Sequence, residues 1–327
     1  MKLPRRTFLH LAAGAAALPA VSRSVWAQTY PTRPITIVDT FPPGGSTGII
    51  ARIIADGLSK TLGQQVIVDQ RGGAGGTVGA RQVARSTPDG YTIMLGFTGT
   101  LAIAPSLYAN AGYDPRKQFA PIGLIGVAPA SLVVHPSFLV HSVPELIAYA
   151  KQNPGKVNFG STDIGSVSHI AGVLLASMAD IKLGHIPYRG TGPTITDLLG
   201  GHILMAFAPV PATHELAKKG SIRMLGVTSL KRSSLLPDVP TIAEQNLPGY
   251  EAVLRYGLVV PTGTPRAVID RVNKELRALL TSEDIRARFA TVGAEPLSST
   301  PEEYAIEIDR EEIKWSTLVR SLGLKAE

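Results

Sequence analysis

The sequence predicts an α/β protein of two lobes, and three observations lead to that prediction. Short runs rich in β-branched residues alternate with segments of helical periodicity, which indicates crossover connections and a largely parallel sheet. About 300 residues follow a predicted N-terminal leader, and that length exceeds what one simple core usually holds. No long linker divides them, so the lobes should share the chain through closely spaced crossings, as at a hinge.

The first residues are typical of an export signal. A basic start that includes Arg5 and Arg6 is followed by a short apolar run, and small residues precede a predicted cleavage site after Ala27. The paired arginines resemble a twin-arginine signal, although a general secretory signal with two arginines has the same pattern. The apolar run is too short and too rich in Ala and Gly for a membrane span. We therefore predict residues 1–27 as a signal peptide and a periplasmic location for the rest.

Composition excludes several classes of function. The formal net charge is +7, but removal of residues 1–27 leaves 28 basic against 25 acidic residues, without a basic run. So small an excess argues against a nucleic-acid partner and is compatible with an anionic ligand. The chain has no Cys, which excludes disulfides and thiolate metal sites. Its histidines lack metal-ligand spacing, so we expect no metal and no cofactor.

The predicted strands come in order along the chain. Each is a short run of β-branched or aromatic residues bounded by turn residues. They are residues 35–38, 66–68, 91–95, 132–134, 157–159, 203–207 and 223–227.

The predicted helices fall between these strands. Between the first two, isoleucines and leucines of residues 49–62 form one apolar stripe, and Gly63 ends it. Later helices have start signals, namely a capping box at Ser142, an N-cap before proline at Thr264 and Thr300, and acids after Ser282. These signals set where the helices begin and end, and they do not indicate a binding or catalytic role.

Polar, glycine-rich loops recur just after a strand and just before a helix, at residues 41–48, 96–100 and 160–169. Open α/β sheets bind ligands at the carboxyl ends of their strands, where free N–H groups and helix dipoles attract an anion. Each loop by itself is also explained as a turn with a cap. Their recurrence predicts a carboxylate or phosphate held by backbone and hydroxyl donors. His169 falls in the first turn of the helix that follows the third loop. A capping role and a ligand contact are equally consistent with this position.

Two other segments match motifs of enzymes or nucleotide-binding proteins in part. Gly44 to Gly48 matches the G-x-S-x-G nucleophile elbow, which would make Ser46 the nucleophile of a secreted hydrolase, but two prolines lengthen the loop and no oxyanion loop precedes it. Residues 71–79 resemble a dinucleotide loop, yet Val78 stands where Gly or Ala is needed. Transport receptor, sensor subunit and hydrolase therefore remain as alternatives, with the hydrolase least favoured.

Eight segments in order along the chain resemble the substrate-binding proteins of tripartite tricarboxylate transporters, also called Bug receptors. They are residues 30–35, 41–47, 73–76, 88–92, 98–103, 185–190, 196–201 and 236–241. The resemblance implies a two-lobed, type II periplasmic-binding-protein fold with a central ligand cleft. It also implies binding of a small organic carboxylate, which is passed to membrane transporter subunits or to a signalling partner such as a membrane kinase.

By the same similarity, three loops would line the ligand. The expected contacts are Phe41, Gly44, Gly45, Ser46, Thr47, Gly48, Thr98, Gly99, Thr100, Ser161, Thr162, Ser166 and His169.

This chain departs from the family pattern at three further positions of interest. Gly48 and Ala208 stand where relatives often have Asp, and Arg255 stands where many have an aromatic residue. Loss of the acids makes the site less suited to an ammonium group, and an inward Arg255 would bind a second carboxylate through its planar fork. We hypothesise a preference for dicarboxylates, with an Arg255 that faces solvent near the hinge as the alternative.

These observations combine in one expectation. Residues 28–126 with 255–327 should form lobe I, and residues 127–254 lobe II. The protein should be a monomeric receptor that closes around an organic acid, catalyses no reaction and binds no nucleic acid.

Overall fold

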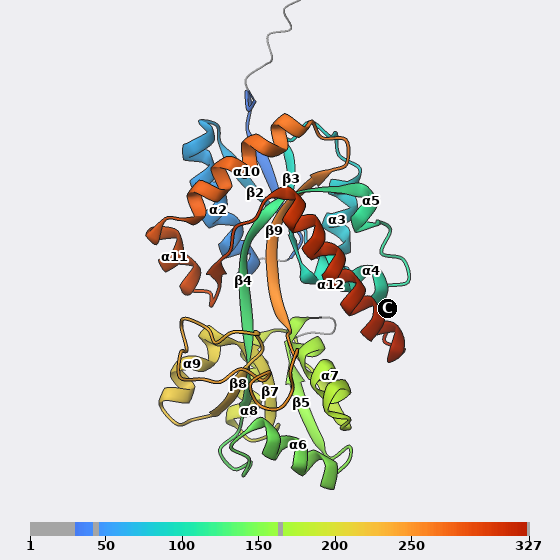
Figure 1. The fold of residues 1–327 in the computed structure, drawn as a ribbon, viewed down its shortest axis with the longest axis vertical. Helices are drawn as coiled ribbons and strands as arrows, with labels where there is room; N and C mark the ends of the chain where they lie inside the picture. Colours follow the sequence, from blue (N-terminus) through green and yellow to red (C-terminus); the bar gives the residue numbers. More distant parts are fainter. Residues whose placement is uncertain (1–29, 42–45, 163–165, 326–327) are drawn as a thin grey trace, which may run out of the picture. The chain divides into compact units, whose positions relative to one another are not determined.

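The computed structural model describes residues 30–41, 46–162 and 166–325, with Ser46 described by its backbone alone. The predicted leader, Gly44 and Gly45 lie outside these residues. The chain divides into two units, Met1–Thr32 and Arg33–Glu327. Every helix and strand below belongs to the second unit (Figure 1).

The sheet starts with three parallel strands, of which the central one has its apolar residues buried on both faces. β1 (Ile35–Asp39) lies between β2 (Val66–Gln70) and β3 (Thr92–Phe97), and Ile37 pairs with both Val68 and Ile93. Burial on both faces explains why β1 reads as a nearly continuous apolar run. The antiparallel strands β9 (Val253–Pro261) and β4 (Phe119–Val134) follow, in the order β2-β1-β3-β9-β4, and β10 (Glu295–Pro296) pairs with β4.

β4 is the strand that both parts of the sheet share. Its residues from Phe119 to Pro129 pair with β9, whereas those from Ala130 to Val134 pair with β7 (Met205–Pro209) and β8 (Arg223–Val227). The register with β9 shifts near Gly123 and Gly126, and such irregularities bend a strand. The 16-residue strand thus passes from one lobe to the other without a break (Figure 1).

The second part of the sheet has the order β4-β7-β5-β6. β5 (Val157–Ser161) pairs in parallel with β6 (Leu183–Pro187) and with β7. Alternate side chains of β5 face different helices. Phe159 lies against α7 (Val167–Ala179), and a Cβ at Gly160 would meet Thr194 of α8 (Thr191–Leu199) at 3.2 Å.

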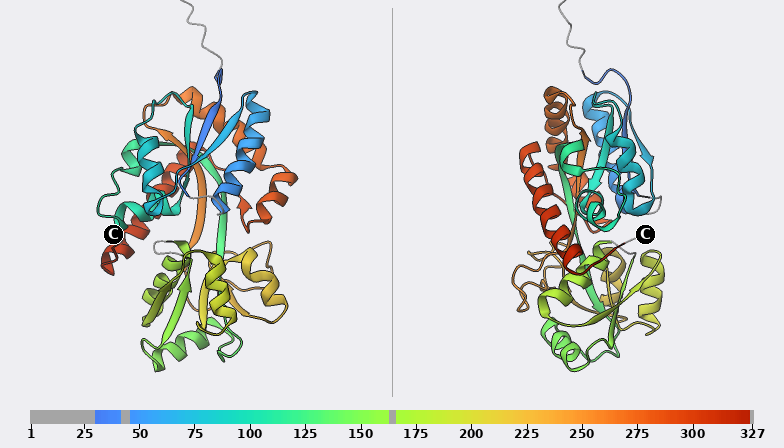
Figure 2. Two further views of the ribbon diagram at one scale, coloured as in Figure 1. Left: turned by 180° about the vertical axis from the view of Figure 1, so that it is seen from behind. Right: turned by 90° about the vertical axis from the view of Figure 1, so that its right-hand side faces the viewer.

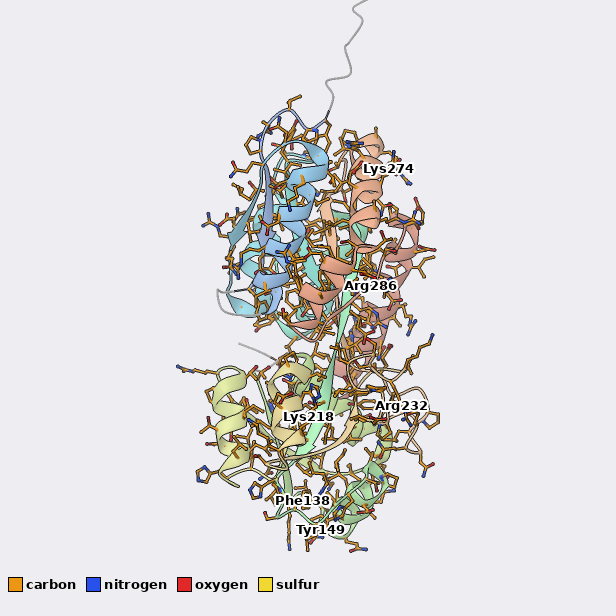
Figure 3. All side chains as sticks on the ribbon, turned by 90° about the vertical axis from the view of Figure 1, so that its left-hand side faces the viewer. Phe138, Tyr149, Lys218, Arg232, Lys274 and Arg286 are labelled. Carbon is orange, nitrogen blue, oxygen red and sulfur yellow. The ribbon has the colours of Figure 1, made fainter. Side chains whose placement is uncertain are left out.

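Further helices connect the strands. They are α2 (Ser46–Leu62), η1 (Ala74–Gly76), α3 (Thr77–Ala84), the π-helical turn η2 (Gly99–Ile103), α4 (Ala104–Leu107), α5 (Pro115–Gln118), α6 (Val143–Gln152), α9 (Val210–Lys218), α10 (Arg266–Leu280) and α11 (Glu283–Ala290). In α6, the ring of Tyr149 meets that of Phe138 edge-on, with centroids 5.0 Å apart (Figure 3).

The C-terminal helix α12 (Pro301–Ser321) packs on β4, η2 and α4 (Figure 2). Its buried Trp315, Leu318 and Val319 belong to one hydrophobic cluster with Ala102 of η2 and Phe159 of β5. Because this cluster joins η2 and α4 to β5 and β7, α12 contributes to packing where the lobes meet. Among the described residues, no helix has the length and apolar character needed to cross a membrane.

Candidate functional site

The described ends of the first predicted loop contact Asp39, the last residue of β1. Its fully buried carboxylate accepts hydrogen bonds from the Phe41 N–H (3.1 Å), the Thr47 hydroxyl (3.3 Å) and the Gln70 amide (3.0 Å). Burial raises the pKa of Asp39, and these hydrogen bonds act in the opposite direction. The carboxylate therefore holds both ends of the loop that joins β1 to α2.

Gly48 provides space for this arrangement. A Cβ at position 48 would lie 2.5 Å from the Gln70 amide nitrogen and 3.4 Å from a carboxylate oxygen of Asp39. A larger residue would displace the amide that binds Asp39. Gly48 thus has a packing role that sequence reasoning missed, because Gln70 lies on another strand.

The second predicted loop is hydrogen-bonded to strand β9. The Thr98 hydroxyl accepts the Arg255 N–H at 3.0 Å and lies 3.4 Å from the Val253 carbonyl, to which it donates. The Thr100 hydroxyl donates to the Phe97 carbonyl at 3.2 Å, and a Cβ at Gly99 would collide with the Phe97 ring. Both threonines are buried. Their hydroxyls hold the loop in shape, and their expected contact with a ligand stays a prediction.

An aromatic contact joins the first two loops. The rings of Phe41 and Phe97 meet edge-on, with centroids 4.9 Å apart. The structure therefore brings Phe41, Thr47 and residues 98–100 together at the carboxyl ends of β1 and β3. We call these residues, with Asp39, the lobe I cluster.

The third predicted loop forms a hydroxyl network at the carboxyl end of β5. Ser168 Oγ lies 2.8 Å from Ser166 Oγ and 2.9 Å from Thr162 Oγ1, and it accepts the Thr162 N–H at 2.9 Å. Ser166 is the N-cap of α7 and accepts the His169 N–H at 3.2 Å. Sequence reasoning missed Ser168, although it lies within the predicted loop.

Two stacked histidines complete this network. The imidazoles of His169 and His185 lie 4.0 Å apart between centroids, and His185 Nε2 is 2.7 Å from the Ser161 hydroxyl. Burial lowers the pKa of both histidines to about 4, and for His169 the charge of His185 adds to the effect. Both rings are therefore neutral at neutral pH. We call Ser161, Thr162, Ser166, Ser168, His169 and His185 the lobe II cluster.

Ala208 lies apart from both clusters. It is fully buried in β7, and its carbonyl accepts the Ser131 hydroxyl at 3.0 Å. Ser131 Oγ also lies 2.7 Å from Thr213 Oγ1. This position is therefore enclosed within lobe II in the structure.

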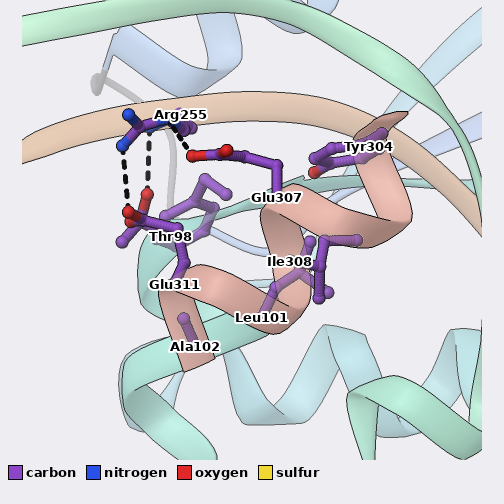
Figure 4. A pocket seen from close by; sticks show the side chains of 9 residues that line it. Thr98, Leu101, Ala102, Arg255, Tyr304, Glu307, Ile308 and Glu311 are labelled. Carbon is purple, nitrogen blue, oxygen red and sulfur yellow. Dashed lines mark hydrogen bonds and ion pairs between the residues drawn. The ribbon is translucent and has the colours of Figure 1, made fainter. Parts of the chain in front are cut away.

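The Arg255 guanidinium forms ion pairs with carboxylates of the protein itself. Nη2 pairs with Glu251 at 2.9 Å, Nε with Glu307 at 2.7 Å and Nη1 with Glu311 at 3.0 Å, and the side chain is 11% exposed (Figure 4). This differs from both alternatives considered for the sequence, an arginine directed at the ligand and one facing solvent. The physical reason is that α12 brings two acids to the arginine from distant positions in the chain. Because all three nitrogen atoms have partners, we no longer place Arg255 among the expected ligand contacts.

Some residues of the clusters had a sequence signal. Asp39 is an acid at the end of an apolar strand, and His185 begins one of the segments shared with the family. Their partners Gln70 and Ser161 are 31 and 24 positions away, so a single sequence did not reveal the contacts. The part of the chain that the structure describes contains no group of three or more side chains suited to a metal ion.

Comparisons with known proteins place this geometry in a family. Residues 50–324 match the family model described as tripartite tricarboxylate transporter family receptor. Among solved structures, Rpa4515 of R. palustris with adipate is 34% identical, with a TM-score of 0.79 over 90% of this chain and 99% of that chain. The periplasmic binding protein BugD is 37% identical, with a TM-score of 0.76 over 91% of this chain and 100% of that chain. MatC from Rhodopseudomonas palustris with bound malate is 30% identical, with a TM-score of 0.75 over 89% and 100% of the two chains.

These likenesses extend over nearly the whole described chain and agree with the fold. They confirm the two-lobed periplasmic-binding-protein fold and the predicted resemblance to Bug receptors. The chain belongs to the receptor family of the tripartite tricarboxylate transporters.

Proposed function

We propose that this protein is a periplasmic receptor that captures a small organic dicarboxylate between the lobe I and lobe II clusters and delivers it to membrane transporter subunits. The observation that carries the proposal is that two polar clusters, one from each part of the sheet, lie at carboxyl ends of strands. Open α/β sheets bind ligands at this edge. Residues 28–126 with 255–327 would form lobe I, and residues 127–254 lobe II, after cleavage behind Ala27.

The electrostatics of the clusters favour an anion held by dipoles. In lobe II, the N-terminus of the 13-residue helix α7 lies beside four hydroxyl groups of residues 161, 162, 166 and 168. A helix N-terminus and hydroxyl donors stabilise a carboxylate without a full positive charge. The histidines are neutral and Arg255 is neutralised by acids, so neither supplies a free cation.

The preference for dicarboxylates rests on the acids near the clusters. The Asp39 carboxylate already accepts three hydrogen bonds from the protein, and Gly48 carries no charge where relatives often have Asp, so the clusters offer little to the ammonium group of an amino acid. The structural relatives with adipate and malate bind acids of the same class. Release follows reopening of the lobes, and the ligand leaves chemically unchanged.

A thermal-shift screen of residues 28–327 tests the proposal. The protein is unfolded and refolded to remove bound molecules, then heated with mono-, di- and tricarboxylates and with amino acids. A ligand at 100 times its Kd stabilises the folded state by about 2.7 kcal/mol, so a dicarboxylate should raise the Tm by several degrees. Calorimetry at constant temperature then gives the affinity and shows whether heat from turnover continues after saturation.

Two outcomes would contradict the proposed function. A flat response to every acid would exclude carboxylates as the ligand class. A larger shift with amino acids would contradict the expected preference for acids without an amino group. As a control, exchange of the exposed His141 for Gln should leave the response unchanged, because this residue lies outside both clusters.

A further inference from the structure

The segment from Tyr250 to Arg255, which we call the hinge segment, contacts the lobe I cluster and the helix that carries part of the lobe II cluster. Its Arg255 N–H donates to the Thr98 hydroxyl of the lobe I cluster at 3.0 Å. Its buried Tyr250 donates through the phenol to the Ala171 carbonyl of α7 at 2.8 Å. Helix α7 carries Ser168 and His169 of the lobe II cluster. One short stretch of chain thus connects to both predicted halves of the binding site.

Helix α12 holds the hinge segment through buried charges. Glu307 and Glu311 of α12 pair with Arg255, and Arg310 of the same helix pairs with Glu251 at 3.3 Å. The Lys314 ammonium donates to the Glu251 carbonyl. Acids and bases in this group are equal in number, and the Arg255 and Glu251 side chains are only 11% and 9% exposed. Such pairs fix geometry strongly, because an unpaired buried charge is costly.

The partners of Glu311 extend the group toward lobe II. The Trp315 Nε1–H donates to Glu311 at 2.9 Å, and Trp315 is 1% exposed. Its ring belongs to the hydrophobic cluster that also contains Ile170, Ala171 and Tyr250. The same helix therefore fixes the hinge segment by ion pairs on one side and by apolar packing on the other.

We propose that Arg255 is a positioning residue for ligand capture: through its ion pairs with Glu251, Glu307 and Glu311, it fixes the hinge segment and thereby holds Thr98 and α7 in their binding geometry. The inference rests on the proposed function for the meaning of the two clusters. A simpler role, in which the ion pairs only attach α12 to β9, predicts faster exchange in η2, on which α12 packs, but no effect on the start of α7. The two roles therefore differ in a measurable way.

Hydrogen exchange of the free protein, measured by mass spectrometry, separates the two roles. The test variant carries Arg255→Gln and Glu311→Gln, which removes one base and one acid and leaves no net charge imbalance. If Arg255 positions both clusters, amides of residues 98–103 and 166–171 should exchange about tenfold faster or more, because local opening becomes easier. Amides of α10 provide an internal reference that should not change.

A matched control carries the same chemical change at an exposed ion pair. Arg266 of α10 pairs with Glu302 of α12 at 2.6 Å, and both side chains are more than half exposed. Exchange of both for Gln should leave residues 98–103 and 166–171 as protected as in the wild type. Arg255→Lys, which keeps the charge but loses the planar fork, should give a smaller increase in the same two segments.

The proposal is overturned if the test variant exchanges faster only in β9, α12 and η2, with residues 166–171 unchanged, or nowhere. Circular dichroism establishes that each variant is folded, and if the double variant is not, Arg255→Lys decides by the same two segments. No ligand is used, so the result does not depend on the acid screen. Failure of every acid to bind the wild type would count against the proposed function, whereas unchanged exchange would count against the positioning role.

Discussion

The imidazoles of His169 and His185 are packed on each other, and this makes the stability of lobe II sensitive to their protonation. Burial lowers both pKa values to about 4, below the ordinary value of 6.5. In the unfolded chain both rings take up protons near pH 6.5, whereas in the folded chain they stay neutral down to about pH 4. Their contribution to stability is therefore fully present above pH 6.5 and is lost as the pH falls toward 4.

We expect that replacing His169 by Asn and His185 by Gln makes the free energy of unfolding less dependent on pH between 6.5 and 4.5. For His169 alone, the slope should fall by up to about 1.4 kcal/mol per pH unit. Urea unfolding at several pH values measures the slope. Comparing slopes with the wild type cancels the opposite contribution of Asp39 and Glu311, whose pKa values are raised. The exposed His141→Gln serves as control, and equal slopes in all three proteins would contradict the neutral histidine pair.

Single residues also show what the sequence did not reveal. The histidine at position 169 was predicted at the N-terminus of a helix, and the structure places it there with its N–H bound to the Ser166 cap. Arg255 was predicted to face ligand or solvent, and its carboxylate partner Glu311 is 56 positions away. Local patterns predict contacts within a loop or helix turn, whereas a buried ion pair depends on which distant elements pack together.

At the scale of elements, runs of β-branched residues predicted several of the strands, and apolar periodicity predicted the first helix. β1, β2, β3, β5 and β8 lie where runs of β-branched residues indicated them. The sequence did not predict β6 or β9, and it predicted only the last three residues of the 16-residue β4. β4 and β9 contain several Gly and Pro residues, which normally mark turns, and their extended form depends on pairing with each other.

Helix starts were predicted with mixed success for a physical reason. Ser142 and Thr300 cap α6 and α12 as expected. The predicted capping box at Ser142 is incomplete, because Glu145 accepts the His141 N–H instead, whereas Thr300 forms a capping box with Glu303. The expected N-cap Thr264 was wrong, since its hydroxyl donates to the Pro261 carbonyl and Pro265 precedes α10 instead. A hydroxyl before proline can accept a backbone N–H of the helix or donate to a carbonyl of the preceding turn, and that of Thr264 donates to the carbonyl.

The cap of α12 gives a prediction at this scale. Thr300→Ala should lower the free energy of unfolding by about 1 kcal/mol, because the Glu303 N–H loses its acceptor. Ser282→Ala at the start of α11 is the control, since Ser282 makes no side-chain cap bond. Urea unfolding measures both variants. Equal losses would show that the Thr300 hydroxyl contributes nothing specific to α12.

The whole molecule differs from a simple pair of lobes because two of its elements, β4 and α12, belong to the packing of both. β4 belongs to both parts of the sheet, and α12 packs on η2 while its Trp315 joins apolar residues of lobe II. Length and the absence of a linker predicted two lobes joined at a hinge. They did not predict a shared apolar cluster, because the C-terminal helix gave no sign of which lobe it would contact.

This shared packing predicts that the body of the protein unfolds as one unit. Trp315 is the one tryptophan that remains after cleavage behind Ala27, so its fluorescence reports on the junction, whereas far-UV circular dichroism reports on all helices and strands. Phe207→Leu in the lobe II core should lower stability by roughly 1–2 kcal/mol and shift both urea transitions equally. Val38→Ala in lobe I should do the same. Because the cluster around Trp315 contains residues of both lobes, neither lobe can lose its core while the other keeps its full packing. Two separate transitions, or a shift in one probe alone, would show that the lobes unfold independently.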